Sequence, residues 1–109
     1  MVTPFANSER LVWQQRGNAA LATVLKMARD RDLPAILWRL NILGDLWGQC
    51  SATRPADRLA EFEAWARALD GSITEVPNLG GRRLSARCPD LVPNVRIGVG
   101  ADIYDVEED

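Results

Sequence analysis

The sequence contains no histidine, a single lysine, and two cysteines that lie far apart. Without histidine, neither a serine–histidine nor a cysteine–histidine nucleophile system can form, and a tetrahedral zinc site loses its usual nitrogen ligand. Paired carboxylates are also missing, because Glu61 and Glu63 are two apart in a predicted helix and face different directions. The acidic residues near the C-terminus match no calcium-loop spacing. The sequence therefore predicts a protein that is not an enzyme, with no catalytic residues, no metal and no cofactor.

Long apolar runs are absent as well. No stretch approaches the roughly 18–20 apolar residues that a membrane-spanning helix needs. The first ten residues, MVTPFANSER, lack the basic and apolar regions of a signal peptide. We therefore expect a cytoplasmic protein with no membrane association. In that compartment Cys50 and Cys88, which form no CxxC pair, are expected to be two buried thiols rather than a disulfide.

The net charge is −2, but the charged residues are unevenly distributed. Residues 102–109 include acidic residues and no basic ones, so the rest of the chain is slightly basic. Residues 105–109 (DVEED) are typical of a solvated acidic tail. Residues 1–7 are expected to form a flexible arm. A chain of 109 residues is long enough for one modest core, so residues 8–104 are predicted to form a single α+β domain.

The stretch 55–69 carries the clearest helical pattern. Its apolar residues recur at helical spacing and form one stripe, made of Leu59, Phe62, Trp65, Ala66 and Leu69. We expect Thr53 to be its N-cap, with Pro55 in the first turn, where a missing N–H costs nothing. Gly71 is expected to take the left-handed conformation that ends the helix.

A second helix is predicted over residues 8–30, with Ser8 as its N-cap. Gly17 lies in its apolar stripe and either permits a close approach to a neighbouring element or, with Asn18, breaks the helix. Turn residues separate the predicted strands, which cover 35–41, 46–51, 72–79, 82–88 and 95–103. The order is therefore α-β-β-α-β-β-β. Successive hairpins favour an α+β fold in which both helices pack on one face of an antiparallel sheet.

Alternation along the strands 82–88 and 95–103 divides their side chains between two faces. The outward face is expected to be polar, to carry arginines, and to be bare where glycine replaces a side chain. Its candidate binding residues are Arg39, Arg83, Arg87, Arg96, Gly98 and Gly100. Strands 35–41 and 46–51 alternate less cleanly, so Trp38 and Trp47 can face either way. Leu11 and Val12 lie outside the apolar stripe of the first predicted helix. The candidate interface residues are Leu11, Val12, Trp38 and Trp47.

Three segments carry a resemblance to a known group of proteins. They are 35–49 (AILWRLNILGDLWGQ), 58–71 (RLAEFEAWARALDG) and a late strand that runs into 103–105 (IYD). Together they resemble small uncharacterised α+β proteins of actinobacteria, over about residues 19–105. The shared features concern packing rather than chemistry. The resemblance implies a similar fold and a bacterial cytoplasmic setting, and it implies no site residues.

These patterns support three functional hypotheses. The leading one is a non-catalytic binding or adaptor module that forms a homodimer or binds another protein, through the outward sheet face or through Leu11 and Val12. The second is a nucleic-acid-binding accessory protein, in which arginines neutralise phosphates and a tryptophan stacks on a base. The third, a small enzyme or ligand-binding protein, requires a pocket that the sequence does not indicate.

Overall fold

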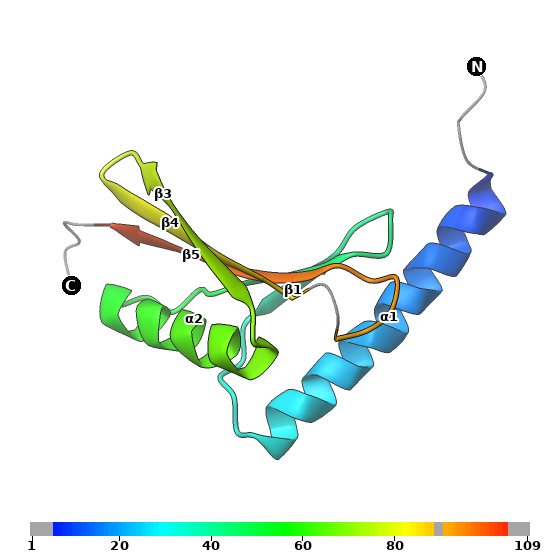
Figure 1. Cartoon of the computed structure of the whole chain (residues 1–109), viewed down its shortest axis with the longest axis horizontal. Coiled ribbons are helices and arrows are strands. Elements are labelled where there is room, and N and C mark those ends of the chain that lie inside the picture. Colours follow the sequence, from blue (N-terminus) through cyan, green and yellow to red (C-terminus); the bar gives the residue numbers. More distant parts are fainter. Residues whose placement is uncertain (1–5, 89–90, 105–109) are drawn as a thin grey trace.

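The computed structural model describes residues 6–88 and 91–104. Its elements follow one another as α1 (Asn7–Asp30), β1 (Leu37–Leu40), β2 (Leu46–Gln49), α2 (Pro55–Leu69), β3 (Ser72–Asn78), β4 (Gly81–Cys88) and β5 (Ile97–Tyr104) (Figure 1). The α+β class is confirmed. Most of the predicted N-terminal arm and the whole acidic tail, 105–109, lie outside the described residues. No helix in the described ranges combines the length and the apolar composition needed to cross a bilayer.

The five strands form one sheet in the spatial order β1-β2-β5-β4-β3. The predicted antiparallel sheet is wrong, because β2 pairs in parallel with β5 while the other three pairings are antiparallel. Hairpin signals specify only the pairing of strands that are adjacent in sequence. Here β5 returns from the β3–β4 hairpin and enters the sheet between β4 and β2. All five residues from Ile97 to Ala101 are buried, as expected for a central strand.

Helix α2 covers one face of the sheet, called the inner face below (Figure 1). Phe62, Trp65 and Leu69 are buried there, in one core with Val99 of β5. Each large apolar side chain buried in this way stabilises the fold by roughly 1.5–3 kcal/mol. The Nε1–H of Trp65 donates a hydrogen bond of 2.8 Å to the carbonyl oxygen of Pro34. The only polar group of this deeply buried side chain is therefore satisfied.

Both predicted N-caps are wrong by one or two residues. The N-cap of α2 is Arg54 rather than Thr53, and the N-cap of α1 is Ala6 rather than Ser8. Neither Arg54 nor Ala6 makes a side-chain hydrogen bond to its helix. A side-chain cap is worth about 1 kcal/mol. The two helices form without that contribution because burial of an apolar face contributes more.

The C-terminal end of α2 also differs from its prediction. Asp70, rather than Gly71, takes the left-handed conformation, with φ 51° and ψ 42°. Gly71 is needed for a different reason. A Cβ at this position would lie 3.1 Å from Cβ of Ala86 and 3.2 Å from the carbonyl oxygen of Arg87. Glycine therefore lets the start of β3 approach β4 closely.

Helix α1 is continuous through Gly17. A Cβ at Gly17 would overlap the carbonyl oxygen of Gly44 and Cδ1 of Leu40, so this glycine permits a close approach to the β1–β2 hairpin. Ala20 and Val24 bring the C-terminal half of α1 into the core that α2 covers. The N-terminal half of α1 runs on past the hairpin (Figure 1). Only part of this long helix is therefore packed on the rest of the chain.

Candidate functional site

A row of four residues crosses the outer face of the sheet, opposite α2. Arg39 of β1 pairs with Trp47 of β2, Trp47 with Gly98 of β5, and Gly98 with Arg87 of β4. At the usual strand spacing the row spans about 14 Å of backbone. Arg96 immediately precedes β5 and lies beside the start of β2. The predicted alternation of β4 is confirmed, since Arg87 is exposed between buried neighbours.

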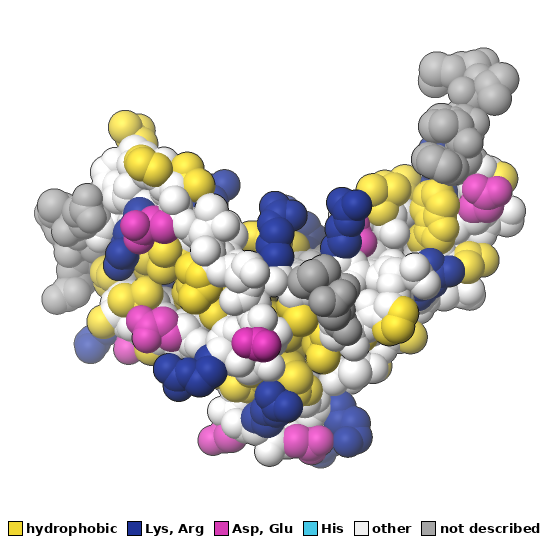
Figure 2. Space-filling model, in the orientation of Figure 1, with side chains coloured by type: hydrophobic (Ala, Val, Ile, Leu, Met, Phe, Trp, Pro, Cys, Tyr) yellow, Lys and Arg dark blue, Asp and Glu magenta, His cyan; other side chains and the backbone are white. Residues whose placement is uncertain are grey.

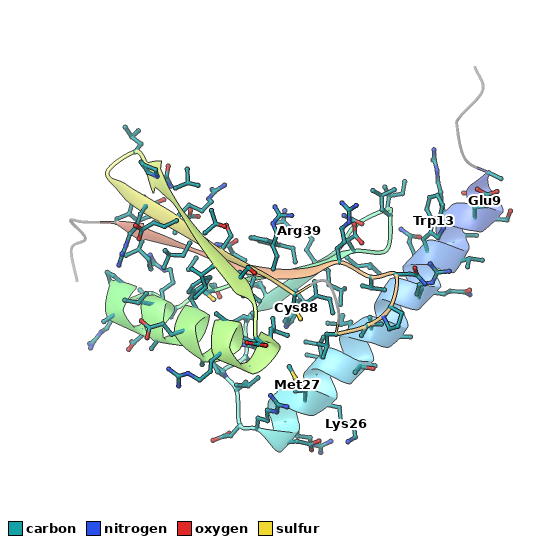
Figure 3. All side chains as sticks on the ribbon, viewed as in Figure 1. Glu9, Trp13, Lys26, Met27, Arg39 and Cys88 are labelled. Carbon is teal, nitrogen blue, oxygen red and sulfur yellow. The ribbon has the colours of Figure 1, made fainter. Side chains whose placement is uncertain are left out.

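This row lies in a hollow of about 620 Å³ on the outer face, which we call the arginine groove. In Figure 2 basic side chains rise from the concave upper edge of the molecule. Figure 3 shows Arg39 in this region, pointing away from α2. A hollow of this size is in the range of known ligand sites, roughly 300–1,000 Å³. The groove is lined by Arg39, Asn41, Asp45, Leu46, Trp47, Ser72, Arg87, Arg96, Ile97 and Gly98.

Three of the predicted arginines converge on this groove. Within residues 6–88 and 91–104, the side chains of Arg39, Arg87 and Arg96 make no ion pair and no hydrogen bond. All three residues are exposed. Their guanidinium groups are therefore available to an anion, to which each can donate charge-assisted hydrogen bonds in a planar, bidentate geometry.

Arg83 differs from the other predicted arginines because it is paired within the protein. Its Nε lies 2.9 Å from Oδ1 of Asp102, and this hydrogen bond, together with the carboxylate charge, raises the pKa of Arg83. Asn78 donates to the same oxygen at 3.4 Å. Arg83 also does not line the arginine groove. We therefore assign it a pairing role on the sheet rather than a place in the site.

Among the residues that the structure describes, Asp45 is the only acidic one that lines the groove, and sequence reasoning did not select it. Its Oδ1 accepts a hydrogen bond of 3.1 Å from the backbone N–H of Arg96. Oδ1 of Asn41 accepts bonds of 2.9 Å from the backbone N–H groups of Leu43 and Asp45. These bonds fix the β1–β2 loop against the start of β5. The sequence predicts a turn between the strands 35–41 and 46–51, but nothing in it placed that turn beside Arg96.

The predicted bare patch at Gly98 and Gly100 is wrong, because the indole of Trp47 covers it. A Cβ at Gly98 would lie 2.8 Å from Cζ3 and 2.9 Å from Cε3 of Trp47, and a Cβ at Gly100 would lie 3.0 Å from Cη2. The Nε1–H of Trp47 donates to Oε1 of Gln49 at 3.1 Å. The indole is thus held over β5 while the residue remains only half-buried.

Trp38, the other tryptophan of the hairpin, faces the inner side. Its ring packs edge-to-face on Trp65, with 5.2 Å between the centroids and 75° between the planes. It also lies over Gly48, where a Cβ would come within 3.0 Å of Cη2 of Trp38. Trp38 is therefore partly buried and packs against the core from the inner face, and its place in an interface stays a prediction.

Exposed apolar residues also occur outside the groove, and two such surfaces concern the predictions made from the sequence. Leu11 and Val12, on the unpacked half of α1, are each 51% exposed. Sequence reasoning selected these two residues but missed the β3–β4 hairpin, where Ile73, Val76 and Leu79 are 60%, 50% and 93% exposed. β3 lies at the edge of the sheet beyond the reach of α2, so the side chains on both of its faces stay in contact with solvent.

Acidic residues and cysteines are the side chains of the described ranges that could ligate a metal ion. They include no group of three or more Cys, Asp or Glu residues placed to hold a metal ion. Cys50 and Cys88 are free and buried. Burial, and secondarily the charge of Glu61, raises the pKa of Cys50 to about 12, so this thiol is protonated and inert at neutral pH.

Comparisons with known proteins return no relative. No protein-family model, no curated protein and no solved structure matches the chain. The resemblance to small actinobacterial α+β proteins therefore stays a prediction. The function is therefore inferred from the surfaces of the fold itself.

Proposed function

We propose that this protein is a non-catalytic binding module that recognises an anionic partner through the arginine groove. One observation carries the proposal: the guanidinium groups of Arg39, Arg87 and Arg96 converge on a single hollow. Within the described part of the chain none of the three is paired, and the lining includes one carboxylate, that of Asp45. Single unpaired arginines are common on protein surfaces. Three in one concavity raise the local positive potential and attract anions.

The experiment compares two triple variants with the same change in net charge. Arg39→Gln, Arg87→Gln and Arg96→Gln remove the groove cations. The matched control replaces three exposed arginines elsewhere, namely Arg29, Arg54 and Arg67, by glutamine. Both variants and the wild type are titrated calorimetrically at low salt with inorganic polyphosphate, a thymidine oligonucleotide and poly-glutamate.

The groove variant should bind at least about tenfold more weakly to whichever polyanion the wild type binds, which corresponds to about 1.4 kcal/mol. The control should retain most of the wild-type affinity. Equal losses in the two variants would show a general charge effect with no site. If the wild type bound none of the three polyanions, the proposal would be wrong.

Self-association, our second candidate function, is supported by a different surface. A twofold dimer built on the outer sheet face would place Arg39, Arg87 and Arg96 close to the same three residues of the second copy, and like charges repel. The half-exposed Leu11 and Val12 on the unpacked half of α1 carry no such charge. We therefore propose α1 as the contact between copies.

Light scattering on a sizing column tests this second candidate. The wild type is expected to be a dimer, and replacement of both Leu11 and Val12 by glutamate is expected to yield a monomer. Replacement of the exposed Ala19 and Ala22 by glutamate introduces the same charge on the same helix and serves as the comparison. A monomeric wild type at all concentrations would contradict the self-association proposal and leave the groove proposal intact.

A further inference from the structure

The indole of Trp47 is a supported aromatic surface at the bottom of the arginine groove. Its six-membered ring lies over two glycines of β5, with Cζ3 and Cε3 nearest Gly98 and Cζ2 and Cη2 nearest Gly100. Side chains at these two positions would displace the ring. The hydrogen bond from Nε1 to Gln49 fixes the opposite edge of the indole. Because Trp47 is only half-buried, part of the supported ring is open to solvent.

The cations lie around this ring rather than on it. Arg39 and Arg87 occupy the same cross-strand row as Trp47, one on each side, and Arg96 is placed at the start of β5. All three residues line the same hollow as Trp47. A ligand that stacks on the indole therefore has guanidinium groups within reach in more than one direction.

We infer that the ligand of the arginine groove is a single-stranded nucleic acid, which stacks a base on Trp47 while the three arginines contact its phosphates. This inference rests on the proposed function and names the class of its ligand. Single-stranded nucleic acid is recognised by this combination of an aromatic platform and a cationic surface. An acidic peptide would use the arginines but would gain little from an exposed indole that glycines hold in place.

The surface around the ring also suits a ligand with flat groups. The space above Gly98 and Gly100 is taken by the indole itself. Beside it on β4 lies Ser85, which pairs with Gly100 of β5 and has a small side chain. A nucleobase stacked on the indole therefore meets little steric obstruction on this side.

The test measures the affinity for a thymidine decamer and for inorganic polyphosphate, by fluorescence anisotropy and calorimetry respectively. Trp47→Leu removes the aromatic ring and keeps the arginines. It should weaken decamer binding by about tenfold, the lower part of the range for loss of one stacked base, and weaken polyphosphate binding much less. Trp47→Phe should restore part of the loss, because it retains an aromatic face.

The salt dependence provides a second readout on the wild type. Three phosphates neutralised on a single strand give a slope of about −2 in a plot of log association constant against log salt concentration. The variant lacking all three groove arginines should have a much flatter slope. A slope that stayed the same in this variant would show that the phosphates bind elsewhere, and would overturn the inference.

A spectroscopic readout detects stacking on the wild type itself, and a Trp47 variant is needed only to assign the signal. With ¹⁵N-labelled tryptophan, the indole N–H signal of Trp47 should shift on addition of the decamer, since its ring is stacked. The signals of Trp38 and Trp65, which pack on each other on the inner side, should stay in place. Trp47→Phe assigns the signal. Movement of all of these signals, or of none, would contradict stacking at this site.

The outcomes separate the inference from the proposed function. If polyphosphate and the decamer bind equally and Trp47→Leu changes neither, the stacking inference is wrong and the anion-binding function stands. If poly-glutamate binds and the decamer does not, the partner is an acidic protein segment and the inference is again wrong. If no polyanion binds, both are wrong.

Discussion

Replacement of Gly17 by alanine tests how α1 is seated on the sheet. In an isolated helix this change is stabilising by about 1 kcal/mol, because glycine is the poorer helix former. In the folded protein the new Cβ would overlap the carbonyl oxygen of Gly44 and Cδ1 of Leu40, and would lie 2.9 Å from the carbonyl carbon of Gly44. Leu40 can rotate away, but the backbone of the hairpin cannot.

Inserting an extra carbon into a close-packed contact costs roughly 1–3 kcal/mol, and a backbone obstacle falls in the upper part of that range. After subtraction of the gain in helix propensity, Gly17→Ala should lower the free energy of unfolding by about 1–2 kcal/mol. For a chain of about 100 residues this corresponds to a fall in Tm of roughly 4–15 °C. Urea unfolding followed by circular dichroism measures both the midpoint and the slope.

The neighbouring residue, Asn18, is the matched control. It is exposed on the same helix, so Asn18→Ala should show only the gain in propensity, about 0.5 kcal/mol. Opposite signs for the two alanine variants would support the close approach of α1 to the hairpin. If Gly17→Ala stabilised the protein as much as Asn18→Ala did, α1 could not lie against Gly44 and the reasoning would be refuted.

Two further predictions concern groups in the core. Nε1 of Trp38 is buried and has no hydrogen-bond partner among the described residues, whereas Nε1 of Trp65 is bonded to Pro34. In urea unfolding, Trp38→Phe should therefore cost about 1–2 kcal/mol less than Trp65→Phe, and equal costs would contradict this. Cys50, with a pKa raised from 9.0 to about 12, keeps its proton in the folded state while the unfolded thiol ionises. Stability should therefore fall between about pH 9 and 12, and a Cys50→Ala variant with the same slope would exclude this cause.

The helices were largely predictable because their patterns are local. Helix α2 was predicted over 55–69, from the apolar stripe between Leu59 and Leu69 and from Pro55 in the first turn, and the structure has the same bounds. The C-terminal end of α2 was less predictable. The residue in the left-handed conformation is Asp70, and glycine is needed at position 71 because the distant strand β4 packs closely there. A glycine in the sequence can indicate that another segment comes close, but it does not show which segment that is.

The sequence predicted which arginines lie on the outer face of the sheet, but it did not predict which of them come together in one groove. Alternation placed Arg87 on the outer face, and the structure gathers it with Arg39 and Arg96. Alternation could not show that Arg83 is paired with Asp102, because that contact depends on the register between β4 and β5. Short local patterns contain no information on register across strands that a long loop separates.

The parallel pairing of β2 with β5, which sequence reasoning missed, is also what assembles the groove. This pairing places Trp47 opposite Gly98, and the neighbours β1 and β4 then bring Arg39 and Arg87 to either side. If the strands lay side by side in chain order, β2 would adjoin β3, and Trp47 would lie away from the glycines that support its indole. The glycines that predicted an empty patch instead make room for a side chain from a strand about 50 residues away in sequence. The mixed topology and the candidate site therefore depend on the same contact, so evidence for Trp47 stacking in solution would also be evidence for the parallel ladder.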